Sequence, residues 1–359
     1  MASYEQRLFR RFPALSMDNR VKPVPCASSQ INVEGAAEHG ACSAVSAQRL
    51  RVALRKIDMQ TPRFTILTTT YNRAHTLGAL AASLEAQTEQ DFEWLVVDDG
   101  SSDGTGELLK ALSLSWGDKL RFEYRTNGGK HRALNYGMSA ARGRWIFIVD
   151  SDDRLPTDAL EKASRLIAEA DAEPDCAGIM GLRVDPEGGV LGERLPDDVR
   201  FMDAASLTYR RGIRGDKAEL FKAEVLRSFP FPEFEGETFI TECVVWYRIA
   251  RSGKTLLVTN DVLYVCDYQG DGLSAKSLEL RVRNPEGTLL FYREALDLDI
   301  PFPGLLREAI NLMRFSILAR RSPVDEILKL SRRRWIPVLG LMPALVLAFW
   351  DKRSLGGYA

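Results

Sequence analysis

The chain has 359 residues, of which 45% are hydrophobic and 27% charged, a composition typical of a globular protein with one large domain or two. Its formal net charge of −1 provides no basic field, so no nucleic-acid partner is expected. The five cysteines are scattered and form no Cys-x-x-Cys pair, which argues against a disulfide framework or a zinc knuckle and favours a reducing compartment. Three isolated histidines argue against a histidine-based metal site.

The first sixty residues differ from the rest of the chain. They mix Arg, Ser, Ala, Pro and Gly without sustained hydrophobic periodicity, and they lack the apolar stretch of a secretory signal. We expect residues 1–60 to be a poorly ordered extension of a domain that begins near residue 61. Met59 leaves two alternatives open, a native start at that methionine or a genuine flexible extension.

From residue 62 onward, short β-branched runs alternate with amphipathic segments. Such alternation predicts a mostly parallel α/β sheet with right-handed crossovers and helices on both faces. The expected strands are Phe64–Thr70, Phe92–Asp98, Leu120–Arg125 and Trp145–Val149, and the expected helices are Thr76–Gln87, Thr105–Leu112 and Lys130–Ala141.

The fourth of these strands ends abruptly at three carboxylates, Asp150, Asp152 and Asp153. Ligands of open α/β sheets bind at the carboxyl ends of the strands, and acidic side chains crowded there repel one another unless a cation compensates. Oxygen ligands of this kind suit Mg²⁺ or Mn²⁺ with substrate phosphates. The alternative is an ordinary acidic turn that caps the next helix.

Three further polar motifs fall at the same predicted edge. The first strand ends in Thr70-Tyr71-Asn72-Arg73, the second in the sequence DDGSSDGT, and Asn127–His131 form a Gly-rich turn with a lysine that could meet a phosphate. DDGSSDGT is also explained as a turn that ends in a helix cap, without any ligand. Neither the Rossmann nor the P-loop glycine spacing is present, which disfavours a dinucleotide dehydrogenase and a P-loop nucleotidase.

In order along the chain, TTTYNR, VVDDGSSDGT, NGGKHRALNYGMSAARGRWIFIVDSDD and ETFITECVVWYRIA resemble the motifs of a family 2 glycosyltransferase with the GT-A fold. The resemblance covers residues 62–292. It implies transfer of a sugar from a nucleotide diphosphate to an acceptor hydroxyl, with inversion at the anomeric carbon.

The resemblance also implies roles for individual residues. The base and ribose would be held by the ends of the first two strands, the diphosphate by the Gly-rich turn, and Mn²⁺ or Mg²⁺ by the Asp-x-Asp pair, with the second aspartate as the more direct ligand. The residues are Thr70, Tyr71, Arg73, Asp98, Asp99, Lys130, Asp150 and Asp152.

The catalytic base of an inverting transfer is expected on the acceptor side. Glu242 follows Thr241, a plausible N-cap, so it would lie in the first helical turn, where the macrodipole favours a carboxylate. The family often has Glu-Asp here with the aspartate as base, whereas this chain has Cys243, a weakly basic substitute. The alternatives are that Glu242 only caps its helix, with Glu237 or Asp153 as base.

The acceptor side is less regular in sequence. We expect a helix at Thr157–Ala170, a strand at Cys176–Val184, a loop-like insertion up to Arg214, short strands at Ala218–Lys222 and Thr255–Val258, and a helix at Thr241–Ser252. Trp246 in that helix could stack on a sugar or face the core, and the core is favoured.

The C-terminal region, residues 271–359, is helical in pattern and follows a GT-A domain at 61–270. The expected helices are Leu278–Leu296, Leu305–Arg320, Val324–Ser331 and the apolar run Trp335–Trp350. That run is too short to span a bilayer. Its aromatic ends and three preceding arginines fit a helix in the cytoplasmic membrane interface, and a helix packed on the catalytic domain is the alternative.

The sequence therefore predicts a cytoplasmic GT-A glycosyltransferase, peripheral at the inner membrane face. Its donor would be a nucleotide-sugar, with uridine as the expected nucleoside, and its acceptor a growing glycan or a lipid-linked acceptor in cell-surface polysaccharide synthesis. Two rival classes remain at this point. One is a sugar-phosphate nucleotidyltransferase, and the other is a non-catalytic glycan-binding protein.

Overall fold

The computed structural model describes residues 61–267 and 277–354. The predicted extension at 1–60 and the predicted domain boundary at 270 both lie outside the described residues.

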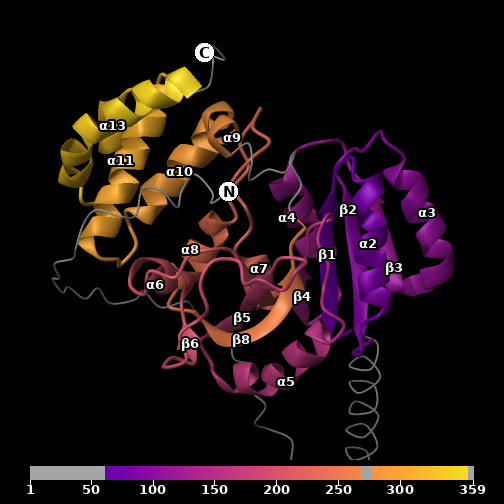
Figure 1. Cartoon of the computed structure of the whole chain (residues 1–359). Coiled ribbons are helices and arrows are strands. Elements are labelled where there is room, and N and C mark those ends of the chain that lie inside the picture. Colours follow the sequence, from indigo (N-terminus) through magenta and orange to yellow (C-terminus); the bar gives the residue numbers. More distant parts are fainter. Residues whose placement is uncertain (1–60, 268–276, 355–359) are drawn as a thin grey trace, which may run out of the picture.

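An eight-stranded mixed sheet forms the centre of the protein (Figure 1). Its order is β3-β2-β1-β4-β7-β5-β8-β6, in which β7 and β6 run antiparallel to their neighbours and the other pairings are parallel. The strands are β1 Phe64–Thr70, β2 Phe92–Asp98, β3 Leu120–Tyr124, β4 Trp145–Ile148, β5 Cys176–Val184, β6 Phe201–Met202, β7 Lys217–Lys222 and β8 Thr255–Val265.

Helices cover both faces of this sheet, which agrees with the burial of every residue of β1 and β2. The helices before the C-terminal region are α2 Ala74–Glu85, α3 Thr105–Trp116, α4 Lys130–Ala140, α5 Ala159–Ala172, α6 Ala204–Tyr209, α7 Ala223–Ser228 and α8 Cys243–Arg251. One apolar cluster joins α2, α3 and α5 to the sheet, and a second joins α4, α7 and α8 to it. The predicted mostly parallel α/β class is confirmed.

Several elements differ from the sequence expectation. The strand expected at Thr255–Val258 runs on to Val265, because β5 pairs with it again beyond an irregularity after Val258. The insertion expected as loop contains β6 and α6, and α7 was not expected at all. The single helix expected at Leu278–Leu296 is two helices that meet at Asn284, since Pro285 supplies no N–H and starts the second one.

The C-terminal helices pack onto the second of the two apolar clusters, so they share a core with the sheet. They are α9 Ser277–Arg283, α10 Pro285–Ala295, α11 Phe302–Leu318, α12 Pro323–Leu328 and α13 Trp335–Ser354. Among the described helices, α13 alone is long and apolar enough, by length and composition, to cross a membrane.

α13 lies along α11 (Figure 1), and a buried ion pair joins the two helices. Arg314 of α11 donates to both carboxylate oxygens of Asp351, from Nε at 2.5 Å and from Nη2 at 2.9 Å, and the two side chains are 3% and 1% exposed. The helices also approach closely through a small residue, because a Cβ on Gly340 would lie 3.1 Å from the backbone nitrogen of Ile310. The two helices are therefore held together by a contact between charges that are both shielded from water.

We expect Asp351→Ala to lower the free energy of unfolding by about 3–5 kcal/mol, because it removes the carboxylate that compensates the buried charge of Arg314. Chemical denaturation measures the loss, and hydrogen exchange along α13 locates it. The double variant Arg314→Leu/Asp351→Leu should recover most of the stability. Arg165→Ala, which breaks the exposed pair with Glu161, is the control and should cost less than about 0.5 kcal/mol. Equal effects of the two alanine variants would contradict the role of the buried pair.

Candidate functional site

The loops after β1 and β2 are bonded to each other at the carboxyl edge of the sheet. Asn72, in the left-handed region with φ 54°, accepts the N–H of Ser102 on its side-chain oxygen, and its own N–H donates to Ser101 Oγ. Asp103 accepts the N–H groups of Ala74 and Thr105. Asp103 thus accepts the first N–H of both α2 and α3, although neither N-cap residue makes a side-chain cap bond, and the same contacts fix the loop that carries Tyr71 and Arg73.

Asp99 organises the Gly-rich turn. Its two carboxylate oxygens accept the N–H groups of Gly128 at 2.9 Å and Gly129 at 2.8 Å. Burial raises the pKa of this carboxyl, although both N–H bonds oppose the rise. Gly129 has φ 97°, and a Cβ there would lie 1.9 Å from the carbonyl oxygen of Thr238. Only glycine fits, and the turn therefore touches the segment that leads into α8.

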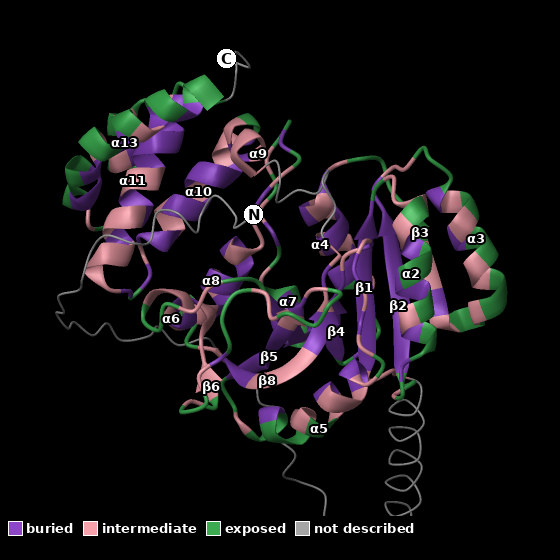
Figure 2. Ribbon diagram, in the orientation of Figure 1, coloured by how far each residue is buried: buried purple, intermediate pink, exposed green. Residues whose placement is uncertain are grey.

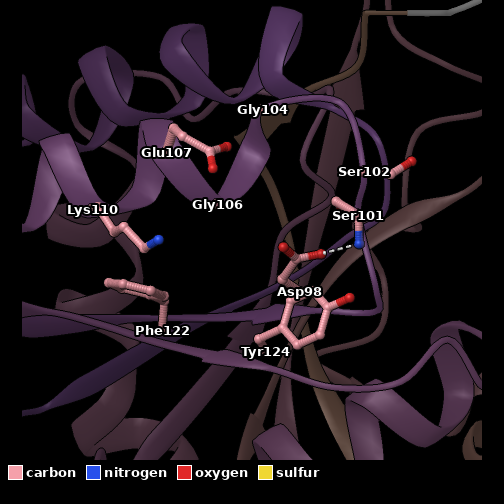
Figure 3. A pocket seen from close by; sticks show the side chains of 9 residues that line it. All are labelled: Asp98, Ser101, Ser102, Gly104, Gly106, Glu107, Lys110, Phe122 and Tyr124. Carbon is pink, nitrogen blue, oxygen red and sulfur yellow. Dashed lines mark hydrogen bonds between the residues drawn. The ribbon is translucent and has the colours of Figure 1, made fainter.

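Asp98 points elsewhere. Its carboxylate accepts the N–H of Ser101 and borders a pocket of about 290 Å³ between the ends of β2 and β3 and the start of α3 (Figure 3). Lys110, Phe122 and Tyr124 also line this pocket. The two adjacent aspartates, expected to act together on uracil or ribose, thus have different partners.

Lys130 lies between two of the predicted site carboxylates. Its ammonium is 2.5 Å from Asp150 Oδ1 and 2.8 Å from Glu242 Oε1. Burial opposes both charged forms, but the pair keeps the pKa of Lys130 above and that of Asp150 below the usual range. The Lys130 side chain is 26% exposed, so solvent and ligands reach this cluster.

Asp152 lies beside this cluster, and nearby cations compensate its negative charge less than they compensate that of Asp150. Among the described residues, the cation within 4.0 Å is Arg73, whose Nε is 3.8 Å from Oδ2, too far for a hydrogen bond. Burial, and next the charge of Asp150, raise the pKa of Asp152. A carboxylate in this condition fits a divalent ion that substrate phosphates complete, as Mg²⁺ and Mn²⁺ prefer. Among residues 61–267 and 277–354, no three acidic, histidine or cysteine side chains converge as a closed metal site.

The third aspartate, Asp153, has a structural partner. It accepts the N–H of Asp267 at 2.8 Å, and burial, followed by the charge of Asp150, raises its pKa to about 7. Glu237, the reserve candidate for the base, is also occupied. Its carboxylate accepts the N–H groups of Glu286 and Gly287 in the first turn of α10.

Three residues beside the Asp-x-Asp turn were missed by sequence reasoning. The hydroxyl of Tyr264 accepts the Asp150 N–H at 2.8 Å, the Arg183 guanidinium lies over the Tyr264 ring, and Glu219 lies 3.8 Å from Arg183. Burial raises the pKa of Glu219 to about 8. Tyr264 belongs to the part of β8 that the sequence did not predict, although the run VLYV is a strand signal.

Of the remaining candidate residues, two follow or end β1 at the edge of the sheet and one lies in the core. The Thr70 hydroxyl is buried without a hydrogen-bond partner among the described residues, whereas Tyr71 is 50% exposed at the mouth of the site. Trp246 stacks on Phe221 in the core, with 4.5 Å between the ring centroids, so it faces the core rather than a sugar, as the sequence favoured.

Comparison with known proteins gives one family. Residues 65–228 match the family model described as Glycosyl transferase family 2. A PGL/p-HBAD biosynthesis glycosyltransferase of Mycobacterium bovis is 34% identical over 112 residues, which is 31% of this chain and 44% of that protein. An uncharacterized glycosyltransferase of Rickettsia bellii is 30% identical over 154 residues, 43% of this chain and 22% of that protein. The chain thus spans less than half the length of these curated relatives.

Solved structures support the fold. The crystal structure of S. aureus TarS 1-349 in complex with UDP-GlcNAc superposes with a TM-score of 0.50 at 20% sequence identity, covering 79% of each chain. At this identity the similarity establishes the architecture of the sheet and its helices.

A buried histidine next to Lys130 in α4 predicts that the folded protein loses stability at acid pH. His131 is 3% exposed, and burial lowers its pKa to about 4. The unfolded chain takes up this proton below about pH 6.5 and the folded chain only near pH 4, so stability is lost as the pH falls through that window. His131→Leu should reduce the loss of unfolding free energy between pH 7 and pH 5 by about 1–2 kcal/mol, measured by urea denaturation. The exposed His75→Leu is the control, and an unchanged pH dependence in His131→Leu would refute the assignment.

Proposed function

We propose that the chain, whose residues 65–228 match glycosyl transferase family 2, is an inverting glycosyltransferase with the GT-A fold that transfers a sugar from a nucleotide-diphosphate sugar, specifically a UDP-sugar. The proposed acceptor is a hydroxyl of a growing glycan or of a lipid-linked acceptor in cell-surface polysaccharide synthesis. The reaction would take place in the cytoplasm, at the inner face of the membrane. The match to a family of enzymes favours a catalytic function over the non-catalytic alternative.

The observation that carries the proposal is the contact of Lys130 with Asp150 and Glu242, beside Asp152 and Arg73. Three carboxylates face two cations, so the cluster keeps one negative charge. Such a site repels a diphosphate by itself and attracts it once a divalent ion has reversed the sign. The charge balance thus suits a donor that arrives with a metal ion.

We assign the metal site to Asp152, with Asp150 beside it and already paired with Lys130. Bound there, Mn²⁺ or Mg²⁺ would neutralise the departing diphosphate. Lys130 would donate to a phosphate oxygen, while the N–H groups of Gly128 and Gly129 hold Asp99 and thereby the shape of the turn. Thr70, Tyr71, Arg73, Asp98 and Asp99 are proposed for the base and ribose.

Glu242 is the proposed catalytic base. It lies at the N-cap of α8, and its side chain accepts no helix N–H, so the carboxylate is not used as a helix cap. Its carboxylate instead reaches Lys130, and its side chain is 30% exposed. A diphosphate that takes over Lys130 would release Glu242 to accept the proton of the acceptor hydroxyl. Asp153 and Glu237 are held by backbone N–H groups, which leaves them poorly placed for this step.

We expect Asp152→Asn to abolish transfer while the protein stays folded, because the neutral amide removes the charge that would hold the metal ion. Calorimetry should show that UDP binding in Mn²⁺ loses its metal-dependent part. The exposed Asp118→Asn is the matched control and should behave like the wild type. Unchanged metal-dependent affinity in Asp152→Asn would remove this residue from the metal site.

Glu242→Gln should lower turnover by about 10²-fold or more without weakening donor binding, because the amide cannot accept the proton and no longer competes with the diphosphate for Lys130. The exposed Glu235→Gln tests for a general effect of charge loss on the same segment. Cys243→Ala tests the position where the family often has aspartate, and it should retain most of the activity. A large loss in Cys243→Ala together with near-normal turnover in Glu242→Gln would transfer the role from Glu242 to Cys243.

A further inference from the structure

The outward face of α13 is a continuous apolar surface. Large hydrophobic side chains recur at helical spacing along it and are between 55% and 71% exposed, and in Figure 2 this exposed side faces away from α11. They are Val338, Leu339, Met342, Val346, Phe349 and Trp350. Contiguous apolar faces of this kind mark interaction sites on soluble proteins.

The opposite face of α13 is fixed to the protein. Gly340, Ala344 and Ala348 are buried against the helical layer, and Asp351 forms the buried pair with Arg314. The apolar face therefore points outward permanently. A transmembrane arrangement of α13 would have to break this pair and strip the packing from α11, whereas contact with a surface needs neither.

The charges on and around this face are positive. Asp351 is the one acidic residue of α13, and it is buried, while Lys352 and Arg353 are exposed at the C-terminal end. Arg332 and Arg334 are exposed at the N-terminal end, where Arg332 contacts Asp297 and Arg334 donates to backbone carbonyls. An apolar stripe between two cationic ends complements the headgroups and acyl chains of an anionic lipid surface.

The aromatic residues strengthen this match. Trp335 stacks on Phe302 at one end of the helix, and Phe349 and Trp350 lie at the other, beneath Arg353. Tryptophan prefers the level of the headgroups. A second copy of the chain fits less well, because two α13 helices would bring cationic ends together in either relative orientation.

We infer that α13 lies flat in the interface of an anionic bilayer and holds the enzyme there through its outward face. This deepens the membrane location proposed above, rests on that part of the proposed function alone, and is independent of the transfer chemistry. The two alternatives from the sequence, an interfacial helix and a helix packed on the protein, are then compatible, since one face of α13 packs on the protein and the other would contact lipid.

Co-sedimentation of the full-length protein with vesicles tests the inference. Wild type should bind phosphatidylcholine–phosphatidylglycerol vesicles, bind pure phosphatidylcholine weakly, and lose binding as salt rises. The triple variant Leu339→Glu/Met342→Glu/Val346→Glu should bind the anionic vesicles at least about ten-fold more weakly, because three charges replace inserted side chains. The matched control is Leu114→Glu on α3, which is 89% exposed and should bind like the wild type.

A second variant separates the electrostatic part. Lys352→Gln/Arg353→Gln should weaken binding to anionic vesicles and reduce its salt dependence, with little change on pure phosphatidylcholine. The inference is overturned if the wild type does not bind anionic vesicles, if the triple variant binds them equally, or if light scattering shows a wild-type dimer that the triple variant dissociates. UDP binding with Mn²⁺, measured by calorimetry on the same variants, should stay unchanged. If the wild type itself showed no UDP binding with Mn²⁺, that result would count against the proposed donor and leave the membrane inference unaffected.

Discussion

The contact of Lys130 with Asp150 and Glu242 is the interaction on which the site depends, because it joins three parts of the fold. Lys130 begins α4, Asp150 follows β4, and Glu242 stands at the start of α8. No short stretch of sequence can make such a contact by itself. It forms only after α4 and α8 have packed on the same face of the sheet, where they share one apolar cluster. The core therefore sets the distances among the charged groups, and those distances set how the site can receive a charged donor.

The ends of the strands could be predicted from the sequence because their signals are local. A β-branched and aromatic run that stops at Asp150 predicts both a buried strand and a polar edge of the sheet. The direction of each side chain could not be predicted in the same way. Asp98 and Asp99 are neighbours, yet one bonds Ser101 and the other bonds the Gly-rich turn. Tyr264 was missed for a related reason, since its strand is extended by pairing with β5, far away in the chain.

The C-terminal region shows the same limit. The apolar run and its basic flanks are visible in the sequence, but the partner of Asp351 is Arg314, 37 residues earlier. Without that partner an acid at the end of an apolar segment looks like a simple boundary. With it, the face of α13 that carries Asp351 is fixed inward, and the opposite face must be exposed. The split of the helix expected at Leu278–Leu296 was available from Pro285, whose missing N–H favours the first turn of a new helix.

The two ionic contacts differ in what a ligand can do to them. Arg314 and Asp351 are almost completely buried, so separating them would leave an unpaired charge in an apolar layer, and the contact acts as a permanent fastening. Lys130 and its carboxylates remain between 26% and 32% exposed, and solvent screening lowers the cost of exchanging one partner for another. A diphosphate can therefore compete for Lys130 where no ligand could compete for Arg314. Glu242 would regain a free carboxylate only after that exchange, so donor binding and activation of the base become one event, and an acceptor that arrives first would find Glu242 still paired.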